Sequence, residues 1–228
     1  EIIKSGGTVV KNVTGYDLSK LICGSFGTLT ILTEITFKVL PAPEESKTLV
    51  IHGFDLNLAT NYLERAVSSS CDISGASFLP SRPICTKCQM DIEKTFKLND
   101  LKYSGSFTSI RLEGSKNSID NRLKKLIKDL KIEKFKISIL ESHQSEIFWK
   151  TIKNLEFFSS SKNNIIRIVI PPSESTKLLY QLPSNYKYFL DWGGALIWME
   201  ACDLTEPKFE SIRKKVIKVG GYISMIKY

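Results

Sequence analysis

The 228-residue sequence is poor in the side chains that most catalytic and metal sites use. It contains only two histidines, His52 and His143, which lie far apart in the chain, and five cysteines. An odd number of cysteines in a chain of this length argues against a disulfide framework and favours a reducing compartment. Neither a lysine-bearing phosphate loop nor the dinucleotide-binding glycine pattern occurs. No group is a convincing general base, because no Ser/His/Asp or paired-carboxylate constellation surrounds either histidine.

Long apolar stretches are also missing. No run approaches the ~20 apolar residues that a membrane-spanning helix needs, and no basic start precedes an apolar signal segment. We therefore expect no transmembrane segment and a cytoplasmic location. Hydrophobic residues make up 42% and charged residues 25% of the sequence, which are ordinary globular values that allow a real core.

The net charge of +8 raises the possibility of nucleic-acid binding. The lysines, however, are scattered over two predicted helices, around Lys124–Lys131 and Lys214–Lys218. Aromatic residues do not alternate with them, as a surface that stacks bases would require. Solvated helix faces explain the charge better, so we expect no nucleic-acid partner.

A single C-x-x-C motif, Cys85–Cys88, is the one cysteine cluster. A structural zinc site needs four ligands, and Cys71 could supply only a third. A thioredoxin-type pair would be expected at a helix start, whereas Pro80 and Pro83 indicate a loop. We expect no metal or redox site here.

The first 44 residues form a small, β-rich part of the chain. Gly6-Gly7 is typical of a turn, Thr8-Val9-Val10 of a short strand, Tyr16–Ile22 of a short helix and Leu29–Val39 of a strand or strand pair. Pro41 and Pro43 cannot continue a central strand. We therefore place a domain boundary between residues 1–44 and 45–228.

Strands and helices then alternate through residues 45–228. Many strands have alternating rather than continuous apolar patterns, which favours a mostly antiparallel sheet over a doubly wound parallel one. We expect an α+β domain whose sheet is covered on one face by helices, built from two ferredoxin-like repeats. The expected strands are Thr48–Gly53, Ile73–Leu79, Phe107–Leu112, Phe135–Leu140, Ile165–Ile170, Tyr188–Leu190, Ala195–Ala201 and Tyr222–Ile226, and the expected helices are Leu56–Ser69, Asn117–Leu130, His143–Leu155, Ser173–Leu182 and Glu206–Val219.

Two loops could contact a ligand. In Gly24-Ser25-Phe26-Gly27-Thr28, free backbone N–H groups and the lack of side-chain bulk suit contact with an anion or nucleotide, although such loops are also ordinary turns. Asp191-Trp192-Gly193-Gly194 could line a pocket, or make a hairpin with Trp192 packed on the sheet. For this second loop we favour the structural interpretation.

Longer motifs give the first loop a context. Lys11–Leu21, Gly24–Leu29 and Glu34–Glu44 closely resemble the FAD-binding subunit of bacterial glycolate oxidase, in the vanillyl-alcohol-oxidase-like (PCMH-type) flavoprotein superfamily. The resemblance continues in the same order through Asp72–Ala76, Arg111–Gly114, Ile168–Pro172, Leu190–Trp198 and Gly220-Gly221.

This resemblance implies that residues 12–31 lie against the flavin nucleotide. The implied FAD contacts are Asn12, Gly15, Asp17, Gly24, Ser25, Gly27 and, through its backbone, Ile31. It implies a flavin-dependent oxidoreductase that takes a hydride from a 2-hydroxy acid such as glycolate, within a multi-subunit complex at the inner membrane. Residues 1–44 would then be the C-terminal part of an FAD-binding domain and residues 45–228 a cap or substrate domain.

The chain also departs from this family. Family members carry an upstream half with the glycine-rich pyrophosphate loop and usually end in a tail that closes on the cofactor, and the sequence has neither. We therefore expect a piece truncated at both ends, inactive in isolation, in which the uncovered strand edge of residues 1–40 pairs with another copy or with the missing half of the flavin domain. The alternative is an inert remnant or interaction module that does not bind FAD alone.

Overall fold

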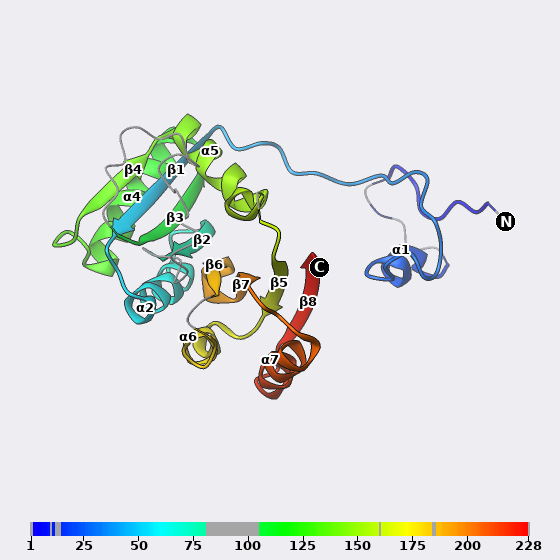
Figure 1. The fold of residues 1–228 in the computed structure, drawn as a ribbon. Coiled ribbons are helices and arrows are strands. Elements are labelled where there is room, and N and C mark those ends of the chain that lie inside the picture. Colours follow the sequence, from blue (N-terminus) through cyan, green and yellow to red (C-terminus); the bar gives the residue numbers. More distant parts are fainter. Residues whose placement is uncertain are drawn as a thin grey trace. The chain divides into compact units, whose positions relative to one another are not determined.

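The computed structural model describes residues 2–9, 11, 15–80, 105–159, 161–183 and 186–227. It divides into two units, Glu1–Ala42 and Pro43–Tyr228 (Figure 1). This division lies two residues from the boundary expected at the proline pair. The predicted C-x-x-C motif at 85–88 lies outside the described residues.

Among its described residues, the first unit contains one helix, α1 (Leu18–Ile22), within the predicted Tyr16–Ile22 segment. The strand predicted for Leu29–Val39 is wrong, since this segment has no regular structure, and Thr8 and Val9 are not in a strand either. The physical reason is that a strand needs a hydrogen-bonded neighbour, and no described segment pairs with this one. None of the described residues before Glu45 is buried.

The second unit begins with a βαββαβ repeat whose four strands are antiparallel and lie in the order β4-β1-β3-β2. This is the ferredoxin-like order of elements. The repeat consists of β1 (Glu45–His52), α2 (Leu56–Val67), β2 (Ile73–Leu79), β3 (Phe107–Gly114), α4 (Lys116–Leu130) and β4 (Ile137–Leu140).

A second repeat has the same order of elements, with its strands arranged β6-β7-β5-β8. The two repeats join where β2 pairs with β6 at Phe78 and Leu190, which gives one eight-stranded antiparallel sheet. The α+β prediction with an antiparallel sheet is therefore confirmed. The second repeat consists of β5 (Asn164–Val169), α6 (Pro172–Tyr180), β6 (Lys187–Asp191), β7 (Leu196–Ala201), α7 (Glu206–Lys218) and β8 (Tyr222–Lys227), and α5 (Ser142–Lys153) with the 3-10 turn η1 (Glu156–Phe158) connects the repeats.

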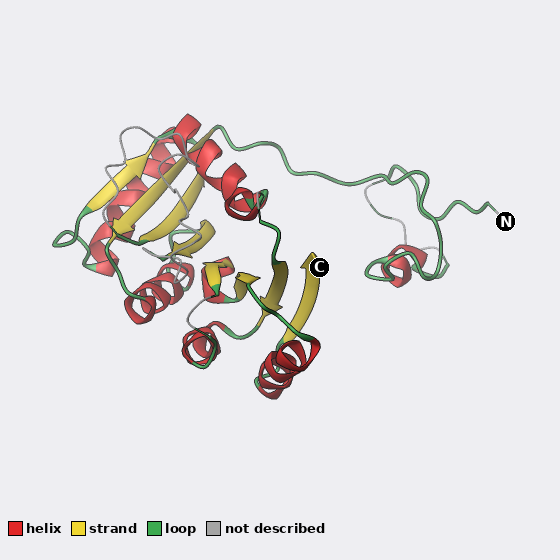
Figure 2. Ribbon diagram, in the orientation of Figure 1, coloured by secondary structure: helices red, strands yellow, loops and turns green. Residues whose placement is uncertain are grey.

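The helices cover the sheet unequally (Figure 2). Helices α2, α4, α6 and α7 contribute to the larger apolar core with side chains such as Leu49 of β1. Successive residues of a strand point to opposite faces, so Val50 faces a second core, formed with Phe148 of α5 and Phe158 of η1. At the β8 end of this second face, Tyr222 is 51% exposed, whereas Arg167 and Trp198 are half-buried.

Helix α2 illustrates why these segments are helical. The Asp55 carboxylate accepts a hydrogen bond from the Leu58 amide at 2.8 Å and caps the helix. Its buried residues Leu56, Ala59 and Leu63 recur every three or four positions and form one apolar face. Among the described residues, no helix is long and apolar enough to cross a membrane.

Candidate functional site

The first candidate site is the loop after α1. The amide of Ser25 donates to the Ile22 carbonyl at 3.0 Å, and the amide of Thr28 donates to the Ser25 carbonyl at 3.0 Å. Gly24 has φ +83° in the first of these turns, whose dihedrals are those of type II. In the second, Phe26 and Gly27 have φ of +51° and +77°, which is typical of a type I′ turn. The two turns follow each other directly.

This geometry has room for a ligand. A Cβ at Gly24 or at Gly27 would meet no atom within 4 Å. Within the part of the chain that the structure describes, the amides of Gly24, Phe26 and Gly27 donate no hydrogen bond. Closely spaced backbone N–H groups of this kind can bind an anionic group. The loop therefore fits contact with the phosphate or ribityl oxygens of a flavin nucleotide.

The other predicted contact residues lie near this loop in sequence, and the structure places them as follows. Asp17 caps α1, accepting from the Lys20 amide at 3.2 Å, and forms an ion pair with the Lys20 Nζ at 2.8 Å. That hydrogen bond and ion pair lower the pKa of the Asp17 carboxyl. Gly15 has φ +81° and Ile31 is exposed, and no hydrogen bond of the described residues links either to the loop. Asn12 lies outside the described residues.

The second predicted loop connects β6 to β7, as the hairpin interpretation expects. Asp191 accepts a hydrogen bond from the Trp192 amide at 2.8 Å, and burial raises the pKa of the Asp191 carboxyl. A Cβ on Gly193 would lie 2.9 Å from Val67 Cγ2, so the turn passes tightly beside α2. Trp192, expected to pack on the sheet, is 57% exposed, and its ring contacts the sheet at Arg167 of β5.

A group of side chains that the sequence reasoning missed surrounds Arg167 of β5. The Arg167 guanidinium carbon lies 5.2 Å from the Trp192 ring centroid, 5.9 Å from that of Trp198 and 5.6 Å from that of Tyr222. Its Nη1 also donates to the Tyr222 hydroxyl. Distances of this size correspond to cation–π contacts. We call these four residues the arginine–aromatic cluster. The signal in the sequence is a single arginine within the otherwise apolar strand Ile165–Ile170.

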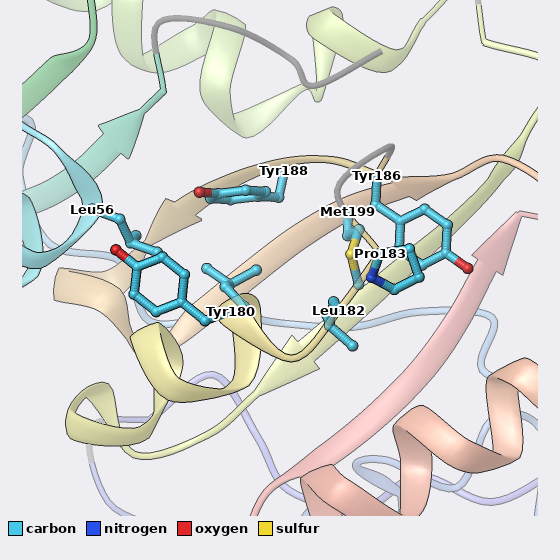
Figure 3. A pocket seen from close by; sticks show the side chains of 8 residues that line it. Leu56, Tyr180, Leu182, Pro183, Tyr186, Tyr188 and Met199 are labelled. Carbon is cyan, nitrogen blue, oxygen red and sulfur yellow. The ribbon is translucent and has the colours of Figure 1, made fainter.

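An apolar hollow of about 170 Å³ lies on the side of the sheet that α2 and α6 cover (Figure 3). Burial raises the pKa of Tyr188 in its wall to about 12. The residues that line the hollow carry no charge, so it offers little to an ionic ligand. They are Leu56, Leu179, Tyr180, Leu182, Pro183, Tyr186, Tyr188 and Met199.

The remaining predicted absences can be stated for the described residues only. No group of three or more histidine, cysteine or acidic side chains is placed to hold a metal ion there. Cys71 is free and fully buried. His143 is exposed, and burial lowers the pKa of His52, whose Nε2 lies 2.8 Å from the Ser138 hydroxyl.

Comparison with known proteins gives relatives of one kind, although no protein-family model matches the chain. Glycolate oxidase subunit GlcE of Escherichia coli K12 is 29% identical over 200 residues, which cover 87% of this chain and 45% of that protein. Glycolate oxidase subunit GlcD of Bacillus subtilis 168 is 42% identical over 81 residues, covering 36% of this chain and 16% of that protein. An FAD-linked oxidoreductase of Mycobacterium tuberculosis is 54% identical over 41 residues, covering 18% of this chain and 9% of that protein.

The chain thus spans less than half the length of these relatives. The GlcE match extends over most of the present sequence and therefore includes much of the antiparallel sheet unit. These similarities confirm the resemblance inferred from the motifs: the chain is similar to glycolate oxidase subunits and, over shorter stretches, to FAD-linked oxidoreductases.

Proposed function

We propose that the chain is part of an FAD-dependent oxidoreductase that oxidises a 2-hydroxy acid such as glycolate. The observation that carries this proposal is the 29% identity to GlcE over 200 residues. The loop after α1 supports it, because glycines at positive φ and free amides occur together where the resemblance expects the flavin nucleotide.

The residues that would hold FAD are those of this loop and its surroundings. Gly24, Ser25 and Gly27 would let the nucleotide approach the backbone closely, while Gly15, Asp17 and Ile31 would border it. FAD supplies the hydride-accepting chemistry when bound. The role of this chain is to bind and orient the cofactor and to exclude water beside it.

We further propose that the chain works within a multi-subunit oxidase, since two of its relatives are named subunits of glycolate oxidase. The assembly would lie in the cytoplasm and reach the inner membrane through its partners. Partners would contribute to the cofactor site, because the contacts of one loop alone compensate poorly for the entropic cost of ordering so large a ligand.

A flavin-content measurement tests the proposal. The natural protein that carries this sequence is purified with its co-purifying partners, and its visible flavin absorbance is recorded. Gly27→Val should abolish or strongly reduce bound FAD, because valine is strained at φ +77° and fills the space beside the loop. Gly6→Val is the matched control, since Gly6 has φ +79° and open space around it.

A yellow wild-type protein whose flavin is lost only in Gly27→Val supports the proposal. A colourless wild-type protein that does not respond to added FAD contradicts it, and favours the inert interaction module instead. Retention of FAD in Gly27→Val would remove the loop from the site.

A further inference from the structure

The arginine–aromatic cluster has the composition of an anion site. Three of its members lie on strands: Arg167 on β5, Trp198 directly opposite it on β7, and Tyr222 on β8, opposite Val169. Trp192 belongs to the turn between β6 and β7. The sheet register therefore gathers these side chains on the second face of the sheet.

The charge on Arg167 has no acidic partner among the described residues. A guanidinium has five N–H donors, and the only described acceptor is the Tyr222 hydroxyl. Glu200 on the neighbouring strand β7 forms an ion pair with Lys187 at 2.9 Å, and Asp191 at the end of β6 accepts a hydrogen bond from the Trp192 amide. A cation held between aromatic rings therefore keeps several donors available.

Arg111 provides an internal comparison. Its guanidinium lies 4.9 Å from the Trp149 ring centroid, a similar cation–π contact. Unlike Arg167, it has an acid partner, Glu113 at 3.3 Å, and donates to Ser74 through both the side chain and the backbone carbonyl. Both arginines are half-buried, but Arg111 has an acid and two further acceptors, whereas the described acceptor of Arg167 is the Tyr222 hydroxyl alone.

We propose that the arginine–aromatic cluster binds the carboxylate of a small organic acid. Two parallel N–H donors of a guanidinium match the two oxygens of a carboxylate. The exposed rings of Trp192 and Tyr222 would contact a short carbon chain, and one cation among apolar walls suits a singly charged acid better than phosphate. That this acid is the 2-hydroxy acid substrate, or the 2-oxo acid made from it, rests on the proposed function.

Indole N–H signals in nuclear magnetic resonance spectra test this without any flavin. The sequence has three tryptophans. Titration of the full chain with glycolate should shift the signals of Trp192 and Trp198. The chemical shift of the Trp149 indole N–H should not change, because that indole is buried and donates to Thr48 Oγ1 at 2.8 Å. Inorganic phosphate is titrated in a parallel experiment.

Variants connect the shifts to Arg167. Arg167→Gln should weaken glycolate binding by at least about tenfold, the loss expected for one charge-assisted hydrogen bond. Arg167→Lys keeps the positive charge but lacks the two parallel N–H donors of the guanidinium, and should bind glycolate with intermediate affinity. Arg213→Gln on α7, which breaks an exposed ion pair with Glu210, should bind like the wild type. An unchanged Trp149 signal in each variant shows that the fold is intact.

The outcomes separate this inference from the proposed function. No glycolate-induced shift in the wild type, an equal shift in Arg167→Gln, or Arg167-dependent binding of phosphate as tight as that of glycolate would each overturn the carboxylate site. If such a protein still contains FAD, the proposed function survives. A colourless protein with an Arg167-dependent glycolate shift keeps the carboxylate site and loses the flavin role.

Discussion

At the residue scale, the sequence predicted the backbone turns at single glycines, but it did not predict which side chains from distant parts of the chain come into contact. Gly24 and Gly27 stand in a pattern of glycine and hydroxyl residues that predicts tight turns, and both have positive φ. Arg167 stands out in its apolar strand, but its neighbours Trp198 and Tyr222 lie more than 30 residues away in sequence. Only the strand register brings them together, and a single sequence does not reveal that register.

The buried ion pair of Lys187 and Glu200 gives a prediction with a defined pH dependence. Burial alone would raise the pKa of the Glu200 carboxyl, but hydrogen bonds from Ser161, Lys187 and Asn163 outweigh it and lower this pKa. A lowered folded-state pKa means that the carboxylate stabilises the fold above its ordinary pKa of 4.5. This stabilisation is lost as the pH falls through the folded-state pKa.

We expect Glu200→Gln to lower the free energy of unfolding by about 3 kcal/mol at pH 7, because it leaves the Lys187 charge buried without its partner. The difference from wild type should shrink as the pH falls below 4.5. Urea denaturation across this pH range measures both effects. Glu210→Gln, in an exposed pair with Arg213, is the control and should cost less than about 1 kcal/mol. Equal losses in the two variants would contradict the prediction.

At the element scale, the sequence predicted the sheet unit closely. The strand Ile73–Leu79 has its predicted bounds, and helix α4 begins one residue before its prediction. These segments carry clear periodicity together with end signals, so local pattern and tertiary packing agree. Leu29–Val39 also has a strand pattern but no described strand to pair with, and there the pattern alone was misleading.

Helix α5 gives the prediction at this scale. It connects the two repeats and covers the second face of the sheet, where Phe148 is fully buried. We expect Phe148→Ala to lower the free energy of unfolding by about 3–5 kcal/mol, through lost burial and the cavity that remains. Chemical denaturation measures this change. Lys150→Ala, at an exposed position of the same helix, should change it by less than about 0.5 kcal/mol, and a similar cost for both would show that α5 does not pack as described.

At the scale of the whole molecule, the two units differ in whether their described apolar side chains are buried. Both apolar cores are built from residues of the second unit, starting at Leu49. In the first unit, apolar side chains such as Tyr16 and Phe26 are almost fully exposed. The domain boundary expected at the proline pair lies two residues from this division, and the strands expected in the first part do not occur among its described residues.

Removal of residues 1–42 tests the independence of the second unit. No described residue before Glu45 is buried, so the removal should change the free energy of unfolding by ~0.5 kcal/mol or less. The midpoint of thermal unfolding of the shortened chain should therefore stay within about 2 °C of that of the full chain. Circular dichroism during heating provides the measurement. A clearly lower midpoint, or a chain that no longer unfolds cooperatively, would contradict the independence of the sheet unit.

The meeting of the two repeats at β2 and β6 has a consequence for how the chain is made. Few described polar contacts cross from one repeat to the other, among them Thr60 with Thr176 at 3.1 Å and Asn57 with Tyr180 at 3.0 Å. All strand partners of β1, β3 and β4 lie within residues 45–140. During synthesis, the first repeat can therefore assemble before the second has left the ribosome. Its edge strand β2 then serves as the template on which the second half docks.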